Sequence, residues 1–202
     1  SKRFKGKIIN KIKNYEIFLI LYKRLQKAKL ISKIVFVTSK HRSDDIFCNI
    51  LKKKKINFFR GDLNNVAQRF LNCAEKYKKK KFIRICCDSP LINWELTDQL
   101  IDLSKKKKFD IITNSLDTKY AKGMGIEIIK TSLLKKNILF FSKIEKEHVT
   151  KYFYKNKFKF KVLKYNRSKK MKFSNYCVDY PSDIKKLNKI IGNKNPIDSL
   201  NF

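Results

Sequence analysis

Short apolar runs alternate along the chain with segments whose apolar residues recur every three or four positions. The apolar runs, which have the length and composition of β-strands, lie at residues 34–37, 56–59, 82–86 and 109–112. The segments with helical spacing lie at residues 44–51, 65–77 and 94–103. Strands that alternate with helices in this way predict an α/β fold with a largely parallel sheet.

Three runs of four lysines occur where a predicted helix gives way to the next predicted strand, at Lys52–Lys55, Lys78–Lys81 and Lys105–Lys108. Lysine near the carboxyl end of a helix is favoured by the helix dipole. In an open α/β sheet, ligands bind at the opposite edge, outside the carboxyl ends of the strands. We therefore expect the lysine runs to lie away from the functional site.

The net charge of +33 over 202 residues is typical of nucleic-acid-binding proteins. However, lysine supplies all but seven of the 50 basic residues, whereas nucleic-acid surfaces rely heavily on arginine. Lysine, asparagine, isoleucine and phenylalanine share A/T-rich codons, so we attribute much of the charge to genome base composition. We expect no specific nucleic-acid partner, although a basic polyanion-binding protein stays as an alternative.

Other features point to a reduced, cytoplasmic protein without a membrane segment. No uninterrupted apolar stretch approaches the roughly 18 residues that a membrane span requires, and there is no secretory signal pattern. The five cysteines form an odd set without a C-x-x-C pair, which argues against a disulfide framework or a zinc site.

Two aspartates are the sharpest candidates for chemistry. Asp88 follows the apolar run at 82–87, Asp179 follows a predicted short strand at 176–178, and each is followed two residues later by proline. Carboxylates at the ends of neighbouring strands suit Mg²⁺, which takes one or two protein carboxylates and completes its shell with water and phosphate oxygens. The alternative is that each aspartate only caps the helix that follows it.

The amino-terminal segment Ser1–Lys7 combines small and basic residues ahead of a predicted helix. Such a loop can hold phosphate groups through backbone N–H groups and cationic side chains. In a lysine-rich chain, the same string could also arise from composition alone.

Six ordered motifs resemble the cytidylyltransferases of the spore-coat polysaccharide biosynthesis protein F type, relatives of the synthetases that activate sialic acid and 3-deoxy-manno-octulosonate with CMP. The resemblance runs from Ser1 to about Ile191. The matching segments are Ser1–Lys7 (S-x-R-x-x-G-K), Phe59–Phe70 (F-R-G-x…D-V-L-x-R-Y), Arg84–Ile92 (R-I-T-x-D-C-P-L-I), Lys122–Ile128 (R-G-L-D-V-E-V), Glu147–Tyr152 (E-H-V-T-P-Y) and Val178–Asp183 (V-D-T-P-E-D).

The resemblance implies a three-layer, Rossmann-like nucleotidyltransferase fold of the type-A nucleotide-diphospho-sugar transferase shape. It further implies Mg²⁺-dependent transfer of CMP from CTP to an acidic or modified sugar, with release of pyrophosphate. On this interpretation Asp88 and Asp179 hold Mg²⁺, and Arg3, Lys7 and Asp88 are the catalytic groups. The nucleotide is contacted by Ser1, Arg3, Lys7, Arg60 and Arg84, and the sugar by Glu127, Glu147 and His148.

Two of the sugar residues also have plain structural explanations. Glu127 lies in the apolar run Gly125–Ile129, where an ion pair with a nearby lysine would explain it equally well. His148 could simply cap or pack on a short helix. A sugar-nucleotide-dependent glycosyltransferase of the same fold is a further alternative, although the D-x-D triplet usual in such enzymes is missing from the sequence.

The chain also departs from the family pattern. The family begins with a strand and a glycine-containing loop, I-I-Q-A-R-M-G, ahead of the serine, and we expect this chain to be truncated relative to that pattern. Gly125, Lys122 and Lys151 replace an acidic residue, an arginine and a proline of the motifs. We expect one nucleotidyltransferase domain over residues 1–192 and an irregular tail over 193–202. The apolar and aromatic stretch at 155–165 is expected to be a strand that packs either on the sheet or on a partner subunit of a homodimer.

Overall fold

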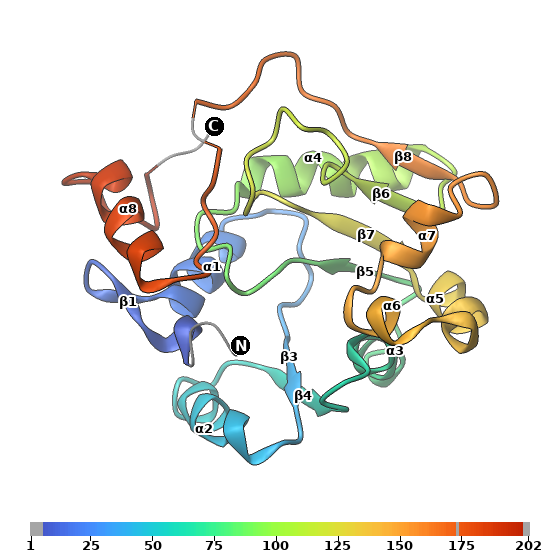
Figure 1. Cartoon of the computed structure of the whole chain (residues 1–202), viewed down its shortest axis with the longest axis horizontal. Helices are drawn as coiled ribbons and strands as arrows, with labels where there is room; N and C mark the ends of the chain where they lie inside the picture. The colour runs from blue at the N-terminus through green and yellow to red at the C-terminus, as the bar shows by residue number, and fades with distance from the viewer. Residues whose placement is uncertain (1–5, 173, 200–202) are drawn as a thin grey trace.

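The computed structural model describes residues 6–172 and 174–199 (Figure 1). Its largest sheet has four strands in the order β5-β7-β6-β8, and a separate parallel pair is formed by β3 and β4. The bounds are β3 Phe36–Ser39, β4 Phe58–Gly61, β5 Lys81–Arg84, β6 Ile111–Thr113, β7 Glu127–Lys130 and β8 Val162–Lys164. Strand β7 is antiparallel to both β5 and β6, while β8 is parallel to β6. The expected mostly parallel arrangement is therefore met only in part.

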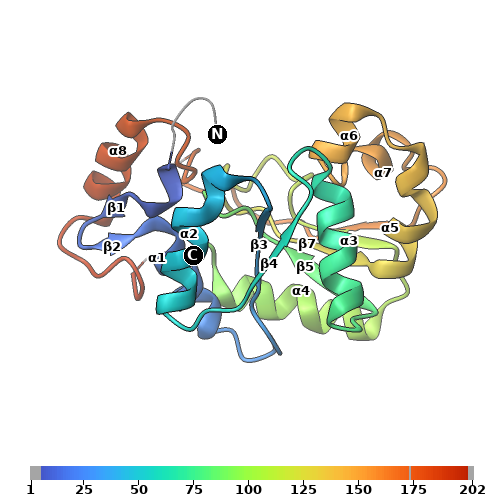
Figure 2. The ribbon, with the colours of Figure 1, turned by 90° about the horizontal axis from the view of Figure 1, so that it is seen from below.

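Eight α-helices are assigned within the described residues. They are α1 Ile17–Gln26, α2 Asp45–Lys53, α3 Val66–Lys76, α4 Trp94–Lys106, α5 Thr131–Asn137, α6 Lys143–Glu147, α7 Lys151–Lys155 and α8 Pro181–Ile191. Short 3₁₀ turns lie at η1 Lys7–Ile9, η2 Arg42–Asp44 and η3 Ile138–Phe140, and β1 Lys11–Ile12 pairs with β2 Tyr15–Glu16 in a hairpin. Figure 2 shows β3 and β4 running between α2 and α3. No described helix is long and apolar enough to cross a membrane.

Helices cover both faces of the four-stranded sheet, which gives three layers. On one face, Ile112 and Ile128 pack with apolar residues of α1 and α4. On the other face, Ile111 and Ile129 pack with residues of α3, α5 and α7. Because neighbouring residues of a strand point to opposite faces, the continuous apolar run of a doubly covered strand supplies both cores.

The lysine runs lie where the sequence predicts them. Helices α2, α3 and α4 end at Lys53, Lys76 and Lys106, and Lys81 begins β5 while Asp88 follows its far end. Two of the runs also close their helices in an unusual way. Lys55 and Lys78 adopt positive φ values of 54° and 50°, a conformation that normally favours glycine.

The expected strand at 176–178 is not a strand of either sheet. Each N–H group there has a different partner: the Tyr176 N–H donates to the Lys122 carbonyl, the Cys177 N–H to Asn175 Oδ1, and the Val178 N–H to the Asp88 carbonyl. The long carboxyl-terminal connection pairs with the chain beside it only through the isolated parallel bridge between Asn175 and Lys122, among the residues that the structure describes. In the stretch at 155–165, only β8 is a strand, and it packs on the sheet of the same chain.

Residues 193–199 form turns that a buried arginine holds against the body of the protein. The guanidinium group of Arg24, which is fully buried in α1, donates to the carbonyl oxygens of Pro196, Ile197 and Ser199. Its Nε donates to the Ile92 carbonyl. This one side chain therefore joins the first long helix, the loop before α4 and the carboxyl-terminal segment.

Candidate active site

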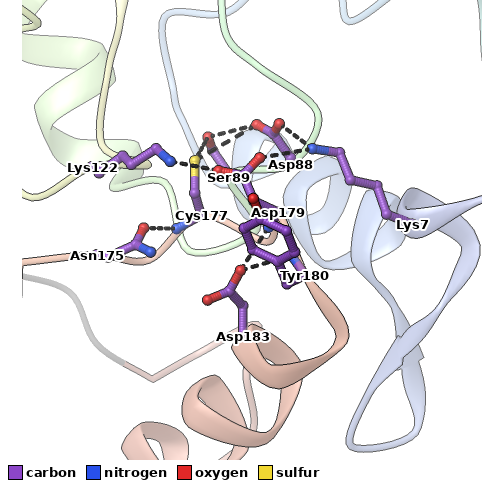
Figure 3. Close-up of polar contacts among 9 residues, drawn as sticks. All are labelled: Lys7, Asp88, Ser89, Lys122, Asn175, Cys177, Asp179, Tyr180 and Asp183. Atoms are coloured by element: carbon purple, nitrogen blue, oxygen red, sulfur yellow. Dashed lines mark hydrogen bonds and ion pairs between the residues drawn. The ribbon is translucent and has the colours of Figure 1, made fainter. Parts of the chain in front are cut away.

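The carboxylates of Asp88 and Asp179 both form ion pairs with one cation, the ammonium group of Lys7 (Figure 3). Lys7 Nζ is 2.6 Å from Asp88 Oδ2 and 3.3 Å from Asp179 Oδ1. A second lysine, Lys122, places its Nζ 2.5 Å from Asp179 Oδ2. Side chains from four distant parts of the sequence thus converge at the carboxyl end of β5.

Backbone contacts hold the two aspartates together. The Val178 N–H donates to the carbonyl oxygen of Asp88 over 2.9 Å, so the segment before Asp179 lies directly beside the segment that follows β5. Behind Asp179, the Asp183 carboxylate accepts the N–H groups of Asp179 and Tyr180, each over 2.8 Å. Pro181 then begins α8, where its fixed φ and missing N–H are well tolerated.

The helix-cap explanation for the two aspartates is wrong. Helix α4 is capped by Asn93, whose side chain accepts the Leu96 N–H. Helix α8 is capped by the reciprocal contacts of Tyr180 and Asp183. Neither the Asp88 nor the Asp179 side chain caps a helix, so both carboxylates are available to a cation.

The electrostatics of the site favour its charged forms. The hydrogen bond from Lys122, together with the charge of Lys7, lowers the pKa of Asp179 below its ordinary value. Burial alone would lower the pKa of Lys7, but the hydrogen bond and charge of Asp88 and the charge of Asp179 raise it. The buried thiol of Cys177, close to the Asp88 carboxylate, has its pKa raised to about 12 and stays neutral at physiological pH.

The residues present fit a magnesium ion. Two carboxylates from separate segments already converge on one positive charge, and their side chains are 23% and 18% exposed, so solvent and ligand can reach them. Among the described residues, no group of three or more metal-binding side chains occurs. A pair of carboxylates is nevertheless what Mg²⁺ uses when substrate phosphates and water complete its shell.

Two of the predicted site residues form a separate, buried network. Glu127 Oε2 lies 2.5 Å from Arg84 Nη1, while Glu127 Oε1 accepts hydrogen bonds from Thr150 Oγ1 and Tyr154 Oη, each over 2.7 Å. The predicted partner of Glu127 was a lysine, and this is corrected to Arg84 because the two residues are register partners on β5 and β7. Burial opposes the charge of Arg84, but Glu127 outweighs it and raises the arginine's pKa.

Three of the remaining predicted residues, Arg60, Glu147 and His148, are described by the structure and are not gathered around Asp88. Arg60 donates to the carbonyl oxygens of Ser39 and His41 and pairs with Asp45, so it braces the loop between β3 and α2. Glu147 and His148 are exposed at the end of α6, and their side chains make no hydrogen bond or ion pair within the described part of the chain. Ser1 and Arg3 lie outside the described residues.

The sequence did not predict three residues that contact the carboxylates of Asp179 and Glu127. Lys122 was noted only as a replacement within a motif, yet it binds Asp179 directly. Thr150 lies within a matched motif, and its hydroxyl group contacts Glu127. Tyr154 follows one helical turn later and binds the same carboxylate oxygen. The motif positions were a usable signal for Lys122 and Thr150, whereas nothing local pointed to Tyr154.

Comparison with known proteins identifies the family of the chain. Residues 1–199 match the family described as cytidylyltransferase, and the chain belongs to that family. It is 31% identical over 166 residues to the uncharacterized protein MJ1063 of Methanocaldococcus jannaschii, covering 81% of this chain and 66% of that protein. It is 30% identical over 105 residues to the spore coat polysaccharide biosynthesis protein SpsF of Bacillus subtilis, covering 50% of this chain and 44% of that protein. The chain thus matches no more than about two thirds of the length of these relatives.

Solved structures show the same nucleotidyltransferase-like α/β fold. A cytidylyltransferase from Leptospira borgpetersenii superposes with a TM-score of 0.91 at 29% identity, covering 98% of this chain and 84% of that one. A CMP:2-keto-3-deoxy-manno-octonic acid synthetase, solved in complex with CTP, superposes with a TM-score of 0.71 at 12% identity, covering 95% and 93% of the two chains. At that lower identity the likeness concerns the fold alone.

Proposed function

We propose that the protein transfers CMP from CTP to a hydroxyl group of an acidic or modified sugar and releases pyrophosphate, as a step in making surface polysaccharide precursors. The observation that carries this proposal is the convergence of Asp88 and Asp179 on one cation at the carboxyl end of β5. Membership of the cytidylyltransferase family supports the reaction. The similarity to SpsF, a spore coat polysaccharide biosynthesis protein, supports the pathway class.

In this reaction the sugar hydroxyl oxygen attacks the α-phosphorus of CTP, and the bond to the leaving pyrophosphate breaks. Such transfers are catalysed mainly by positioning and by neutralising charge. Asp88 and Asp179 would hold Mg²⁺, which lowers the pKa of an attacking hydroxyl and polarises the phosphorus. Lys7, once released from the carboxylates, reaches the same space with its positive charge, and with Arg3 it would neutralise the triphosphate.

Glu127 and Arg84 have a positioning role in this proposal. The carboxylate of Glu127 already pairs with Arg84 and accepts hydrogen bonds from Thr150 and Tyr154, so it is not free to accept a hydrogen bond from a sugar hydroxyl group. The network instead fixes the start of α7 against β5 and β7. Glu147 and His148, which are exposed just before α7, remain the candidates for sugar contact.

The reaction can be tested by incubating the purified protein with CTP, Mg²⁺ and a panel of acidic sugars while measuring pyrophosphate release. Release should depend on Mg²⁺ and one of the sugars, and Asp88→Asn or Asp179→Asn should abolish it while circular dichroism stays unchanged. Asp102→Asn is the matched control, because Asp102 is an exposed carboxylate on α4 whose one ion pair among the described residues is with Lys106. Activity that survives both site substitutions would contradict the metal assignment.

A further inference from the structure

A polar cavity of about 290 Å³ opens between the start of α4 and the loops that follow β6 and β8. Small-molecule sites usually span about 300–1,000 Å³, so this cavity has the size for a small ligand such as a monosaccharide. None of the four residues that form the carboxylate site lines it. Its polar walls come from Glu95, Gln99, Tyr120, Tyr165, Asn166 and Arg167.

Hydrogen bonds within the protein fix the walls of this cavity. The Arg167 N–H donates to Asp117 Oδ2 over 2.7 Å, which ties the loop after β8 to the loop after β6. The Tyr165 N–H donates to the Thr113 carbonyl over 2.8 Å, at the end of β6. Tyr165 Oη donates to Gln99 Oε1 over 3.0 Å, which joins the second loop to α4. The cavity is therefore formed before any ligand arrives, so ligand binding does not have to order these loops.

Several polar groups of the cavity lack a partner among the residues that the structure describes. Arg167 uses Nε for the Lys169 carbonyl, but its two terminal nitrogens form no hydrogen bond or ion pair within residues 6–172 and 174–199. Gln99 accepts through Oε1, while its Nε2 has no acceptor in that part of the chain. The side chains of Asn166 and Glu95 likewise form no hydrogen bond to any described residue. The cavity thus offers free donors and free acceptors together.

Arg167 gives the cavity a preference for an anion. Its Cζ lies 6.0 Å from the ring centroid of Tyr120, which lines the same cavity, and Glu95 does not pair with it. A guanidinium group with both terminal nitrogens free matches the two oxygens of a carboxylate. At four other arginines a terminal nitrogen is already bonded to an acceptor of the protein, namely at Arg24, Arg60, Arg69 and Arg84.

The cavity is distinct from the carboxylate site but shares a loop with it. Tyr120 and Met124 line the cavity, and Lys122, which lies between them in the sequence, pairs with Asp179. Met124 is buried in the same core cluster as Val178, the residue before Asp179. A ligand in the cavity would therefore bind against the loop that carries Lys122 and not on the two aspartates.

We propose that this cavity is a separate binding site for a sugar acid, a monosaccharide that carries one carboxylate. The carboxylate pairs with the two terminal nitrogens of Arg167. Sugar hydroxyl groups both donate and accept, so they can bond to Gln99 Nε2, to the Asn166 amide and to the Glu95 carboxylate. A simple inorganic anion would leave Gln99 and Glu95 without partners, and a neutral sugar would leave Arg167 without its counter-charge. The inference does not rest on the proposed reaction, because this binding needs neither CTP nor Mg²⁺.

The test is to titrate D-glucuronate and D-galacturonate into the 202-residue protein without CTP or Mg²⁺, and to follow its backbone amides by nuclear magnetic resonance. We expect saturable binding of at least one of the two, with the largest shifts at the amides of Gln99 and Arg167 and smaller shifts at Asp88 and Asp179. No binding of either sugar acid at millimolar concentration would overturn the proposal. Shifts that are largest at Asp88 and Asp179 would also overturn it, since the sugar acid would then occupy the carboxylate site.

Matched ligands separate the contributions of the carboxylate and the hydroxyl groups. D-Glucose and D-galactose keep the hydroxyl groups but lack the anion, so each should bind at least about tenfold more weakly than its acid. Acetate keeps the carboxylate but lacks the hydroxyl groups, and it should also bind at least about tenfold more weakly. Acetate binding as tight as that of the sugar acids would overturn the proposal, because the cavity would then be a plain anion site.

Two variants test the residues of the cavity, with the melting temperature as a check on folding. Arg167→Gln removes the guanidinium group and should weaken sugar-acid binding at least about tenfold. Arg42→Gln is the matched control, because it removes the same charge from an exposed arginine of η2 outside the cavity. Gln99→Glu keeps the oxygen that accepts from Tyr165 but loses the donor, so it should also weaken binding. Equal losses in Arg167→Gln and Arg42→Gln would overturn the proposal, since they would reflect only attraction to a basic protein.

Discussion

The guanidinium group of Arg84 and the carboxylate of Glu127 face each other across neighbouring strands, with 2.5 Å between Nη1 and Oε2. Their side chains are only 18% and 6% exposed. Removing one partner of a buried pair leaves the other charge uncompensated in a poorly solvated place. Glu127→Gln should therefore lower the free energy of unfolding by roughly 3 kcal/mol, measured by urea denaturation at pH 7.

The matched control is the exposed pair of Lys135 and Glu75, whose side chains are 69% and 41% exposed. Glu75→Gln removes the same charge from a solvated surface, so it should cost less than about 1 kcal/mol. Equal losses for the two glutamine variants would mean that burial of the Arg84 pair contributes nothing to its strength.

Much of the local structure could be predicted from the sequence. Helical spacing over 65–77 and 94–103 corresponds to α3 at Val66–Lys76 and α4 at Trp94–Lys106. The longer α4 takes in Lys105 and Lys106, because lysine is a good helix former near a carboxyl end. The pairing of Asp88 with Asp179 was also predictable, since both follow apolar runs that end at one edge of the fold.

The direction of β7 and the partners of the buried charges were not predictable in the same way. No helix separates β6 from β7, so the crossover that a parallel pair needs is missing, and this signal was overlooked. Lys122 and Tyr154 acquire their partners only through tertiary contacts with Asp179 and Glu127. In a chain so rich in lysine, no local pattern distinguishes Lys122, which meets Asp179, from the lysines that stay in solvent.

The lowered pKa of Asp179 predicts how stability depends on pH. A carboxyl group whose pKa is lower in the folded than in the unfolded protein stabilises the fold above its ordinary pKa of 3.8. This contribution is lost as the pH falls through the folded-state pKa. Asp179→Asn should cost roughly 1–2 kcal/mol at pH 7, and its difference from the unmodified protein should vanish well below pH 4.

Denaturation of both proteins across this pH range measures the effect. Asp102→Asn, at a carboxylate that is 44% exposed, raises the large net positive charge by the same amount without touching the site. If its pH profile matches that of Asp179→Asn, the effect comes from overall charge and not from the contacts with Lys122 and Lys7.

Lys7 competes with any metal ion for Asp88 and Asp179. Its ammonium group lies within 3.3 Å of both carboxylates, so a divalent cation has to displace it. Lys7→Gln should therefore strengthen Mn²⁺ binding in the absence of nucleotide by about tenfold or more, followed through the electron paramagnetic resonance of free Mn²⁺. Lys11→Gln, at an exposed lysine of β1, should have no effect, and adding Asp88→Asn to Lys7→Gln should cancel the gain.

Lys78 ends α3 in a conformation that suits glycine better. Its N–H donates to the Glu75 carbonyl, and the N–H of Lys79 donates to the Ala74 carbonyl, the two bonds of a Schellman motif. Lys78 takes a φ of 50°, where a β-carbon crowds the backbone. Lys78→Gly should raise the free energy of unfolding by about 0.5–1 kcal/mol, measured by urea denaturation, because relief of this crowding exceeds the added entropy of the unfolded chain.

Lys79, the next residue, does not have a positive φ. Lys79→Gly should lower stability by up to about 1 kcal/mol, because there glycine only adds freedom to the unfolded chain. Lys55 closes α2 with the same pair of bonds and a φ of 54°, so Lys55→Gly repeats the test at an independent helix end. A loss of stability in Lys78→Gly as large as that in Lys79→Gly would show that lysine bears no strain at this position.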